Sequence, residues 1–499
     1  METRTESLTQ TTGRALSWNY LGSFLRLFLA FGVNVLLTRL LGPKPFGEFA
    51  IAMLLFGFGF LLANVGITSA LIQRAEISSL DIRFCFTCQM IVTILVASLL
   101  AMSAPAWSIF FHQPELTTLL RAIVPLFIFQ SFGTTSSALL NRAQRNREIQ
   151  SASIISYLTG FIGFAVPMAF LGCGVWCLVA AYLAQALVNA VLLYRQTRHS
   201  LKPLLHREGT ALLRFGFNVF GCNLCNWGIG NLDNTVVGRV AGPIALGLYS
   251  RAFLLAQLPA DTLVVNLQQV MLPAFSRVQG DSKRLARVFL SVFGLLALVL
   301  LPPFCAMATV PGVVILGLYG PKWAGAIPLF QPLALALPLY GLMGLSGPTL
   351  AARGKPRTEL MIQFPIVLIA LVAFTISIHF SLPCLSWCVL CVYVLRFAGM
   401  THAALRELGI GWQSVIRVAW PALLLAAIAA ATAFGIDSIL PMASRTARLA
   451  IVAAGVATAI LIAAVKGYRF LLTPILRDTP QIRDLLSSQF KLLLRWGRA

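Results

Sequence analysis

The chain has 499 residues, of which 58% are apolar and only 11% are charged, and its mean hydropathy is +0.84. Soluble globular proteins carry about 25% charged residues, so this composition, with its uncharged runs of about twenty residues, is typical of a chain that spans a bilayer. It excludes a soluble enzyme, a secreted disulfide scaffold and a disordered chain. The net charge of +22 does not indicate nucleic-acid binding, because the basic residues fall in short loops between apolar spans.

Apolar stretches of helical length follow one another along the whole chain. The first fifteen residues are polar, and the apolar stretch that follows them is too long for the core of a signal peptide. We therefore predict an all-α polytopic membrane protein with about 14 transmembrane helices. In chain order they are expected near residues 16–41, 46–72, 84–111, 119–140, 151–171, 175–194, 215–240, 247–275, 288–310, 326–350, 360–378, 384–403, 418–437 and 447–466.

The order of these spans predicts the division of the chain. The expected parts are a cytoplasmic N-terminus (1–15), an N-lobe (16–195), an inter-lobe linker (196–214), a C-lobe (215–403), two extra helices (404–466) and a basic tail (467–499). The tail alternates Leu and Ile with Arg and Lys, which indicates an amphipathic helix on the inner leaflet; a solvated basic tail is the alternative.

Basic residues are distributed unevenly between alternate loops. Most of the loop Lys and Arg residues lie on the side that holds both termini, and the opposite loops hold only Lys44, Lys322, Arg445 and Arg448. Since cytoplasmic loops carry the excess of Lys and Arg, we expect both termini in the cytoplasm.

Ten cysteines do not predict a disulfide framework here. Cys85/Cys88 and Cys222/Cys225 have CxxC spacing, but both pairs lie inside apolar segments, and the five histidines are scattered. Small side chains that pack between helices are the better interpretation. We expect no metal and no cofactor.

One motif occurs twice in the same register, 200 residues apart. Asn34, Arg39, Gly42, Pro43 and Gly47 match Asn234, Arg239, Gly242, Pro243 and Gly247. Gly42 and Gly242 can end a helix and the following proline prevents its continuation, so the motif itself is predicted to be structural. Six expected spans separate the copies, which therefore have the same orientation. This predicts a parallel repeat about an axis along the membrane normal, a symmetry found in transporters.

Ionisable and amide side chains also occur at membrane depth, where they usually face a cavity or a partner. Arg26 lies about ten residues into the first expected helix, and a cavity role is favoured over snorkelling or an ion pair. The amide side chains of the span near 215–240 are expected either to line a water-filled wall or to form hydrogen bonds between helices. The candidate substrate-binding residues are Arg26, Asn34, Asn226, Asn231, Asp233, Asn234 and Arg251, with Gln130, Gln185, Asn189 and Arg396 as weaker candidates.

The charge at membrane depth is mostly cationic, which suits an anionic ligand, because arginine forks match phosphate or carboxylate oxygens. Asp233 and Asp261 are the candidates for binding a coupling ion or proton. An ion pair between Arg251 and either aspartate is an equally good interpretation.

The segments Leu36–Ala50, Asn231–Phe253 and Met271–Arg277, together with Pro259, resemble the polysaccharide transporter family of the MOP flippase superfamily, especially its Wzx and WzxC-like members. The resemblance implies a V-shaped, MATE-like protein of two six-helix lobes around a cavity, multi-pass in the bacterial inner membrane. It also implies that the substrate is an undecaprenyl-pyrophosphate-linked oligosaccharide, flipped by alternating access for exopolysaccharide, O-antigen or capsule synthesis. In relatives, cationic residues of the first helix line the cavity, and Arg26 occupies a corresponding position.

Two other members of that superfamily remain alternatives. A lipid II flippase shares the cationic cavity chemistry, whereas a cation-coupled drug antiporter needs acidic groups that the first expected helix lacks. An enzyme is not expected, because no Asp-x-Asp motif occurs and the outward loops are short. The expected partners are the lipid-linked oligosaccharide and membrane lipids, not nucleic acid. Whether a polysaccharide polymerase or a chain-length regulator binds is left open.

Overall fold

The computed structural model describes residues 29–63, 71, 77–204, 210–277, 281–439 and 444–466. All regular secondary structure in these ranges is helical, so the prediction of an all-α membrane protein is confirmed. Eleven of the described helices are long and apolar enough to cross a membrane, and Leu29–Leu41 is a shorter apolar helix. The total of 14 helices remains a prediction.

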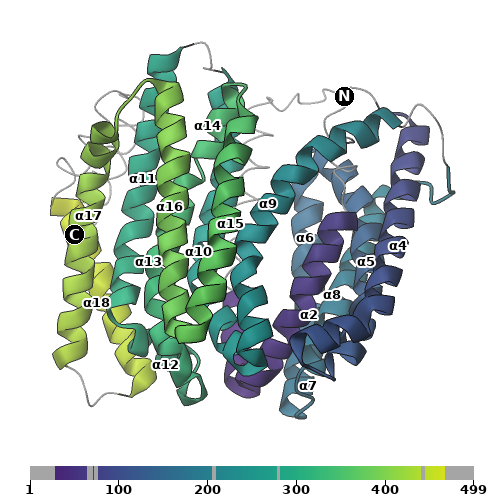
Figure 1. Cartoon of the computed structure of the whole chain (residues 1–499), viewed down its shortest axis with the longest axis horizontal. Helices are drawn as coiled ribbons and strands as arrows, with labels where there is room; N and C mark the ends of the chain where they lie inside the picture. The colour runs from purple at the N-terminus through teal and green to yellow at the C-terminus, as the bar shows by residue number, and fades with distance from the viewer. Residues whose placement is uncertain are drawn as a thin grey trace, which may run out of the picture. The chain divides into compact units, whose positions relative to one another are not determined.

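The chain consists of two compact units, residues 1–247 and 248–499. In the first unit α5 packs against α4 and α8, and α9 contacts α2 and α4 (Figure 1). Besides Leu29–Leu41, its described helices are α2 (Pro43–Ala63), α4 (Ser79–Phe111), α5 (Leu116–Arg142), α6 (Asn146–Tyr157), the π-helix η1 (Leu158–Ala165), α7 (Val166–Phe170), α8 (Trp176–Thr197), α9 (Thr210–Val240) and the start of α10 (Gly242–Arg277).

In the second unit α11 packs on α13 and α17, while α16 packs on α13 and α15 (Figure 1). Besides the rest of α10, its helices are α11 (Ser282–Thr309), α12 (Pro311–Leu318), the 3₁₀ helix η3 (Pro321–Ala326), α13 (Ile327–Met343), α14 (Ser346–Ala352), α15 (Pro356–Phe380), α16 (Leu382–Leu408), α17 (Trp412–Ile439) and α18 (Arg445–Lys466).

Helix α4 begins five residues before the apolar stretch that predicts it, because a capping box fixes its start. The Ser78 hydroxyl accepts a hydrogen bond from the Asp81 backbone N–H at 3.1 Å, and the Asp81 carboxylate accepts one from the Ser78 backbone N–H at 2.9 Å. Two N–H groups that lack a partner within the helix are thereby satisfied.

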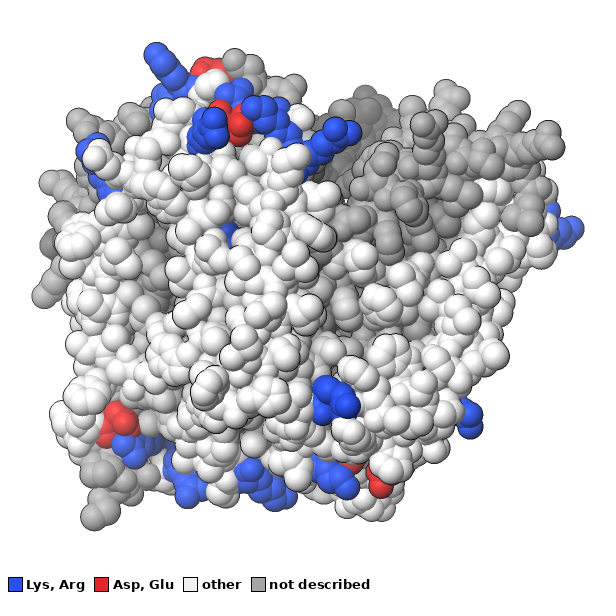
Figure 2. All heavy atoms as spheres, viewed as in Figure 1, with Lys and Arg blue, Asp and Glu red and all other residues white. Residues whose placement is uncertain are grey.

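Helix α15 has one exposed apolar face and one face that is buried in the protein. Met361, Phe364 and Val372 are exposed, whereas Gln363, Ala370 and Phe374 on the other face are buried. On the face drawn in Figure 2, charged side chains gather at the two ends of the helices, and the band between them is almost free of charge. Both features match a bilayer-spanning chain, whose exposed middle must be apolar.

The span Asn146–Phe170 is continuous but not uniformly α-helical. Its middle, η1, is a π-helix that lies against α8, and Gly160 makes the close approach possible. A Cβ atom at Gly160 would lie 2.5 Å from the carbonyl oxygen of Ala181, so no larger residue fits there without a shift of the backbone.

Candidate functional site

The predicted site residues divide between the two units. Asn34, Asn226, Asn231, Asp233 and Asn234 belong to the first unit, and Arg251 and Asp261 belong to the second. Arg26 lies outside the described residues. Asn34 is half-buried, and its side-chain oxygen accepts a hydrogen bond from the Thr38 hydroxyl at 3.5 Å.

Helix α9 places its predicted polar residues in different environments. Asp233 is 2% exposed, and its carboxylate accepts hydrogen bonds from the Asn234 backbone N–H at 2.7 Å and from the Asn234 side chain at 3.1 Å. The Asn231 side chain donates to the Trp227 carbonyl at 2.9 Å, so it is bound to its own helix. Asn226 is exposed. Asp233 and Asn234, which are neighbours in the sequence, are therefore joined by two hydrogen bonds.

The first glycine of the duplicated motif has the same φ angle in both copies. Gly42 has φ +79° and Gly242 has φ +80°. The next helix begins directly after Gly42 in the first copy and at Gly242 in the second. The prediction that these glycines end a helix is confirmed, since this left-handed conformation favours glycine.

The second glycines of the two copies contact each other's turn within the first unit. A Cβ atom at Gly47 would lie 1.6 Å from the Pro243 carbonyl oxygen, and one at Gly247 would lie 2.0 Å from the Pro43 carbonyl oxygen. The contact is thus reciprocal, and it holds α2 and the start of α10 at a backbone-to-backbone distance that only glycine permits.

Arg251 and Asp261 lie on the same continuous helix, α10. Ten residues of α-helix correspond to a rise of about 15 Å, which exceeds the combined reach of the two side chains and excludes an ion pair between them. The backbone carbonyl of Arg251 accepts a hydrogen bond from the Tyr319 hydroxyl at 3.5 Å. The Asp261 carboxylate instead accepts hydrogen bonds from the Tyr340 hydroxyl and the Gln257 amide.

A buried polar network continues from Asp261 through the second unit. Arg396 on α16 is 5% exposed and donates a hydrogen bond to the Gln363 side-chain oxygen at 2.6 Å. The Gln363 amide donates in turn to the Glu359 carboxylate at 2.7 Å. Tyr340 on α13 lies within electrostatic range of Arg396 and thereby connects the network to Asp261. Four helices, α10, α13, α15 and α16, contribute to it.

This network can hold one cation and up to two carboxylates in a low-dielectric interior, where electrostatic interactions are strong. Sequence reasoning identified Asp261 and, as a weaker candidate, Arg396, but it missed Glu359 and Gln363. A signal was present: their i, i+4 spacing places both on one face of the helix, and no Lys, Arg, Asp or Glu follows Glu359 in this span. The nearby basic loop residues made Glu359 resemble a solvated loop charge.

The sequence is similar to those of known proteins. Residues 36–328, more than half of the chain, match the family described as Polysaccharide biosynthesis protein. The succinoglycan biosynthesis transport protein ExoT of Rhizobium meliloti (strain 1021) is 27% identical over 328 residues, which are 66% of each chain. The lipopolysaccharide biosynthesis protein WzxC of Escherichia coli (strain K12) is 23% identical over 365 residues, 72% of this chain and 73% of the relative.

Two solved structures show the same fold. The lipid II flippase MurJ, in an inward closed conformation, superposes with a TM-score of 0.74 at 13% identity over 91% of this chain and 99% of its own. An inward-facing MATE family multidrug resistance transporter of the MOP superfamily gives a TM-score of 0.59 at 14% identity, over 77% of this chain and 94% of its own. These likenesses concern the fold alone.

Proposed function

Because the chain belongs to the polysaccharide biosynthesis protein family, with Wzx-like transporters among its relatives, we propose that it flips undecaprenyl-pyrophosphate-linked oligosaccharide repeat units across the bacterial inner membrane. The chain is a multi-pass transport protein, not an enzyme. The observation that carries the proposal is the family match over residues 36–328, together with relatives named for polysaccharide transport and biosynthesis.

In this proposal Arg26 binds the pyrophosphate, since a guanidinium fork matches phosphate oxygens. Amide side chains on the same route bind sugar hydroxyls, which both donate and accept hydrogen bonds. The proposed binding residues are Arg26, Asn34, Asn226, Asn231, Asp233, Asn234 and Arg251. The exposed side chain of Asn226 and the half-buried one of Asn34 support this assignment, because they are accessible to a substrate in part.

Alternating access would expose the head group first inside and then outside the membrane. The matching turns at Gly42 and Gly242, and the reciprocal contact of Gly47 and Gly247, support a duplicated architecture with a parallel repeat. The proposed orientation has both termini in the cytoplasm, where the excess of basic loop residues lies.

Energy for the cycle would come from the membrane potential or from a coupled ion, and one charge moved through 100 mV corresponds to about 2.3 kcal/mol. We propose Asp233 and Asp261 as the coupling residues. The environment of Asp261 favours it, because its hydrogen-bond donors, Tyr340 and Gln257, are both neutral. A carboxylate whose hydrogen bonds come from neutral donors can release or bind a proton when its surroundings change.

The test is a translocation assay in a strain that lacks this gene. It measures how many undecaprenyl-linked repeat units become accessible outside, with wild type, Arg26→Ala, Arg26→Lys and the control Arg284→Ala at matched expression. Arg284 is exposed at the start of α11, where its backbone and not its side chain takes part in the helix cap. We expect wild type and Arg284→Ala to restore translocation, Arg26→Ala to fail, and Arg26→Lys to restore it in part, since lysine keeps the charge but not the fork.

Restoration by Arg26→Ala would refute the site assignment but not the function. If wild type does not restore repeat-unit translocation but relieves depletion of the resident lipid II flippase, the substrate is lipid II. If it does neither and lowers the accumulation of a cationic dye, the protein is a drug antiporter.

A further inference from the structure

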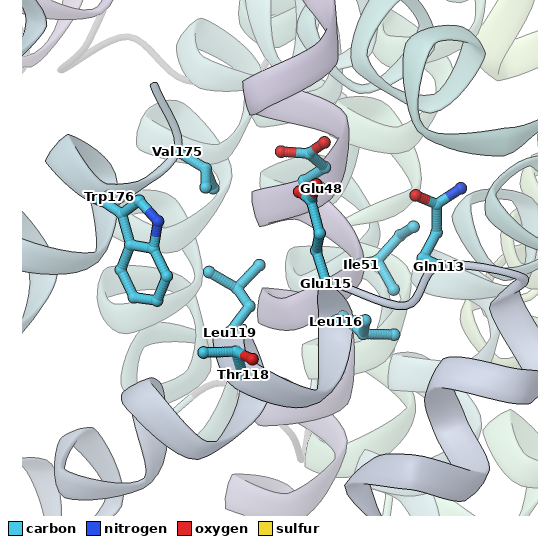
Figure 3. Close-up of a pocket in the computed structure, with 9 residues that line it drawn as sticks. All are labelled: Glu48, Ile51, Gln113, Glu115, Leu116, Thr118, Leu119, Val175 and Trp176. Carbon is cyan, nitrogen blue, oxygen red and sulfur yellow. The ribbon is translucent and has the colours of Figure 1, made fainter. Parts of the chain in front are cut away.

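A cavity of about 300 Å³ opens at one end of the first unit (Figure 3). Its wall combines residues of α2, of the α4–α5 connection, of the first turn of α5 and of the start of α8: Glu48, Ile51, Gln113, Glu115, Leu116, Thr118, Leu119, Val175 and Trp176. The volume is at the lower end of the range of about 300–1,000 Å³ that is typical of small-molecule sites, so it suits one ring-sized group and not an extended chain.

The cavity lies at the end of the unit that the basic-residue distribution predicts to face outward. The connections at 42–45, 112–118 and 172–174 are three of the expected outward loops. Gln113 and Glu115 lie within the second, Val175 directly follows the third, and Glu48 lies three residues after the first. A ligand in this cavity therefore arrives from the external side of the membrane.

One side of the cavity carries hydrogen-bonding groups. The Glu48 side chain is 12% exposed and forms an ion pair with Lys44 at 3.4 Å. Glu115 precedes α5 but its side chain makes no capping hydrogen bond to that helix in the described structure, so its carboxylate can serve the cavity. The amide of Gln113 adds a group that both donates and accepts, and so does the hydroxyl of Thr118, which lies beside Leu119 in Figure 3.

The opposite side is apolar and flat. Figure 3 shows the indole of Trp176 across the cavity from Glu48 and Glu115, with Val175 and Leu119 on the wall between them. Trp176 is 43% exposed, so a large part of its ring is available to a ligand. Tryptophan offers an extended apolar surface with one polar edge.

A flat aromatic wall opposite carboxylates and an amide suits a ring with one apolar face and a rim of hydroxyl groups, which describes a pyranose sugar. The two glutamates and Lys44 leave a net negative charge, which disfavours a phosphate or an acidic sugar and favours a neutral or an amino sugar. Hydroxyl groups donating to carboxylates form the stronger, charge-assisted class of hydrogen bond.

We propose that this cavity is a sugar-binding subsite that holds one neutral or amino-substituted pyranose ring of the glycan head group at the outward end of the first unit. The inference rests on the proposed function, since a translocated oligosaccharide is what would deliver sugars to this face. Holding one ring outside disfavours return of the head group to the inward side.

The first experiment measures binding directly. Saturation-transfer NMR on the full chain in lipid nanodiscs would use free glucose, galactose, N-acetylglucosamine, glucosamine and glucuronic acid as probes. We expect a signal for at least one neutral or amino sugar and none for glucuronic acid. Trp176→Ala and Glu115→Gln should each weaken binding about tenfold, because one stacked ring or one charge-assisted hydrogen bond contributes on that scale.

Trp387→Ala is the matched control. Trp387 is 45% exposed and lies five residues after the start of α16, beside another expected outward loop, but not in the cavity. If Trp176 only anchors the chain at the membrane interface, as tryptophans often do, the two tryptophan variants will behave alike in the sugar assay. That result, absence of any sugar signal in wild type, or binding unchanged in both cavity variants would overturn the proposal.

Translocation in the deletion strain separates this inference from the proposed function. If wild type restores translocation and the cavity variants lower it while Trp387→Ala does not, both stand. If wild type and the cavity variants restore it equally, the flippase stands and the subsite is refuted. If wild type itself does not restore it, the proposed function fails, whatever the NMR result.

Discussion

The sharpest structural prediction concerns the substitution Gly47→Ala at the contact between α2 and the start of α10. The added Cβ atom would lie 1.6 Å from the Pro243 carbonyl oxygen, whereas real Cβ contacts are essentially never shorter than 3.0 Å. The two backbones must therefore separate by at least 1.4 Å. No side chain can move aside to relieve the clash, since the obstructing atom belongs to the main chain.

The expected loss of stability follows from two opposing effects. Overpacking a close contact costs about 1–3 kcal/mol, and the upper part of that range applies because the backbone itself must move. Replacing glycine by alanine within a helix returns about 0.5–1 kcal/mol. We expect a net loss of about 2 kcal/mol, which lowers the midpoint of thermal unfolding by about 4–8 °C for a unit of this size.

Thermal unfolding of detergent-purified protein at a fixed scan rate measures this shift. Gly230→Ala is the matched control, because Gly230 is in helix α9 and a Cβ atom there meets nothing within 4 Å among the described residues. It should leave stability unchanged or slightly raised. Gly247→Ala should act like Gly47→Ala, and the double variant should lose less than the sum, since one separation relieves both clashes. Equal stability of Gly47→Ala and wild type, or additive losses, would refute the reciprocal contact.

Three further predictions use the same unfolding assay. Arg396→Met removes the cation from the buried network and should lower the free energy of unfolding by about 3 kcal/mol, because it leaves a buried carboxylate without compensation. Adding Glu359→Gln should restore part of this loss. A double variant no more stable than Arg396→Met would contradict the prediction. Ser78→Ala removes the α4 capping box and should cost about 1 kcal/mol, whereas Ser79→Ala should not. Burial lowers the pKa of His199 from its usual value of 6.5. Stability should therefore fall as the pH drops below about 6.5, because the unfolded chain then binds the proton more readily than the folded one. His199→Gln should remove this dependence of stability on pH.

Composition and local motifs predict much of the fold. The membrane class follows from the lack of charge, and the turns at Gly42 and Gly242 follow from glycine and proline chemistry that acts over a few residues. The start of α4 at Ser79 could also have been predicted, because Ser78 and Asp81 form a recognisable capping box in the sequence.

The buried network and the outward cavity could not be predicted in the same way. Arg396, Gln363 and Tyr340 come from three helices, and sequence spacing carries no information on which helices meet. Glu48 and Trp176 are more than a hundred residues apart and share a cavity only because α2 and α8 belong to one unit. Pairing between elements is decided by packing, which a single sequence does not display.

The π-helix of the span Asn146–Phe170 has a consequence for how the chain tolerates changes in length. Deleting one residue from an α-helical span rotates everything beyond it by about 100°, so lipid-facing side chains turn toward the protein. In η1 the turns are wider, and loss of one residue can be absorbed by tightening a π turn into an α turn. One-residue deletions among related chains should therefore be concentrated in residues 158–165, where the membrane register on both sides survives them.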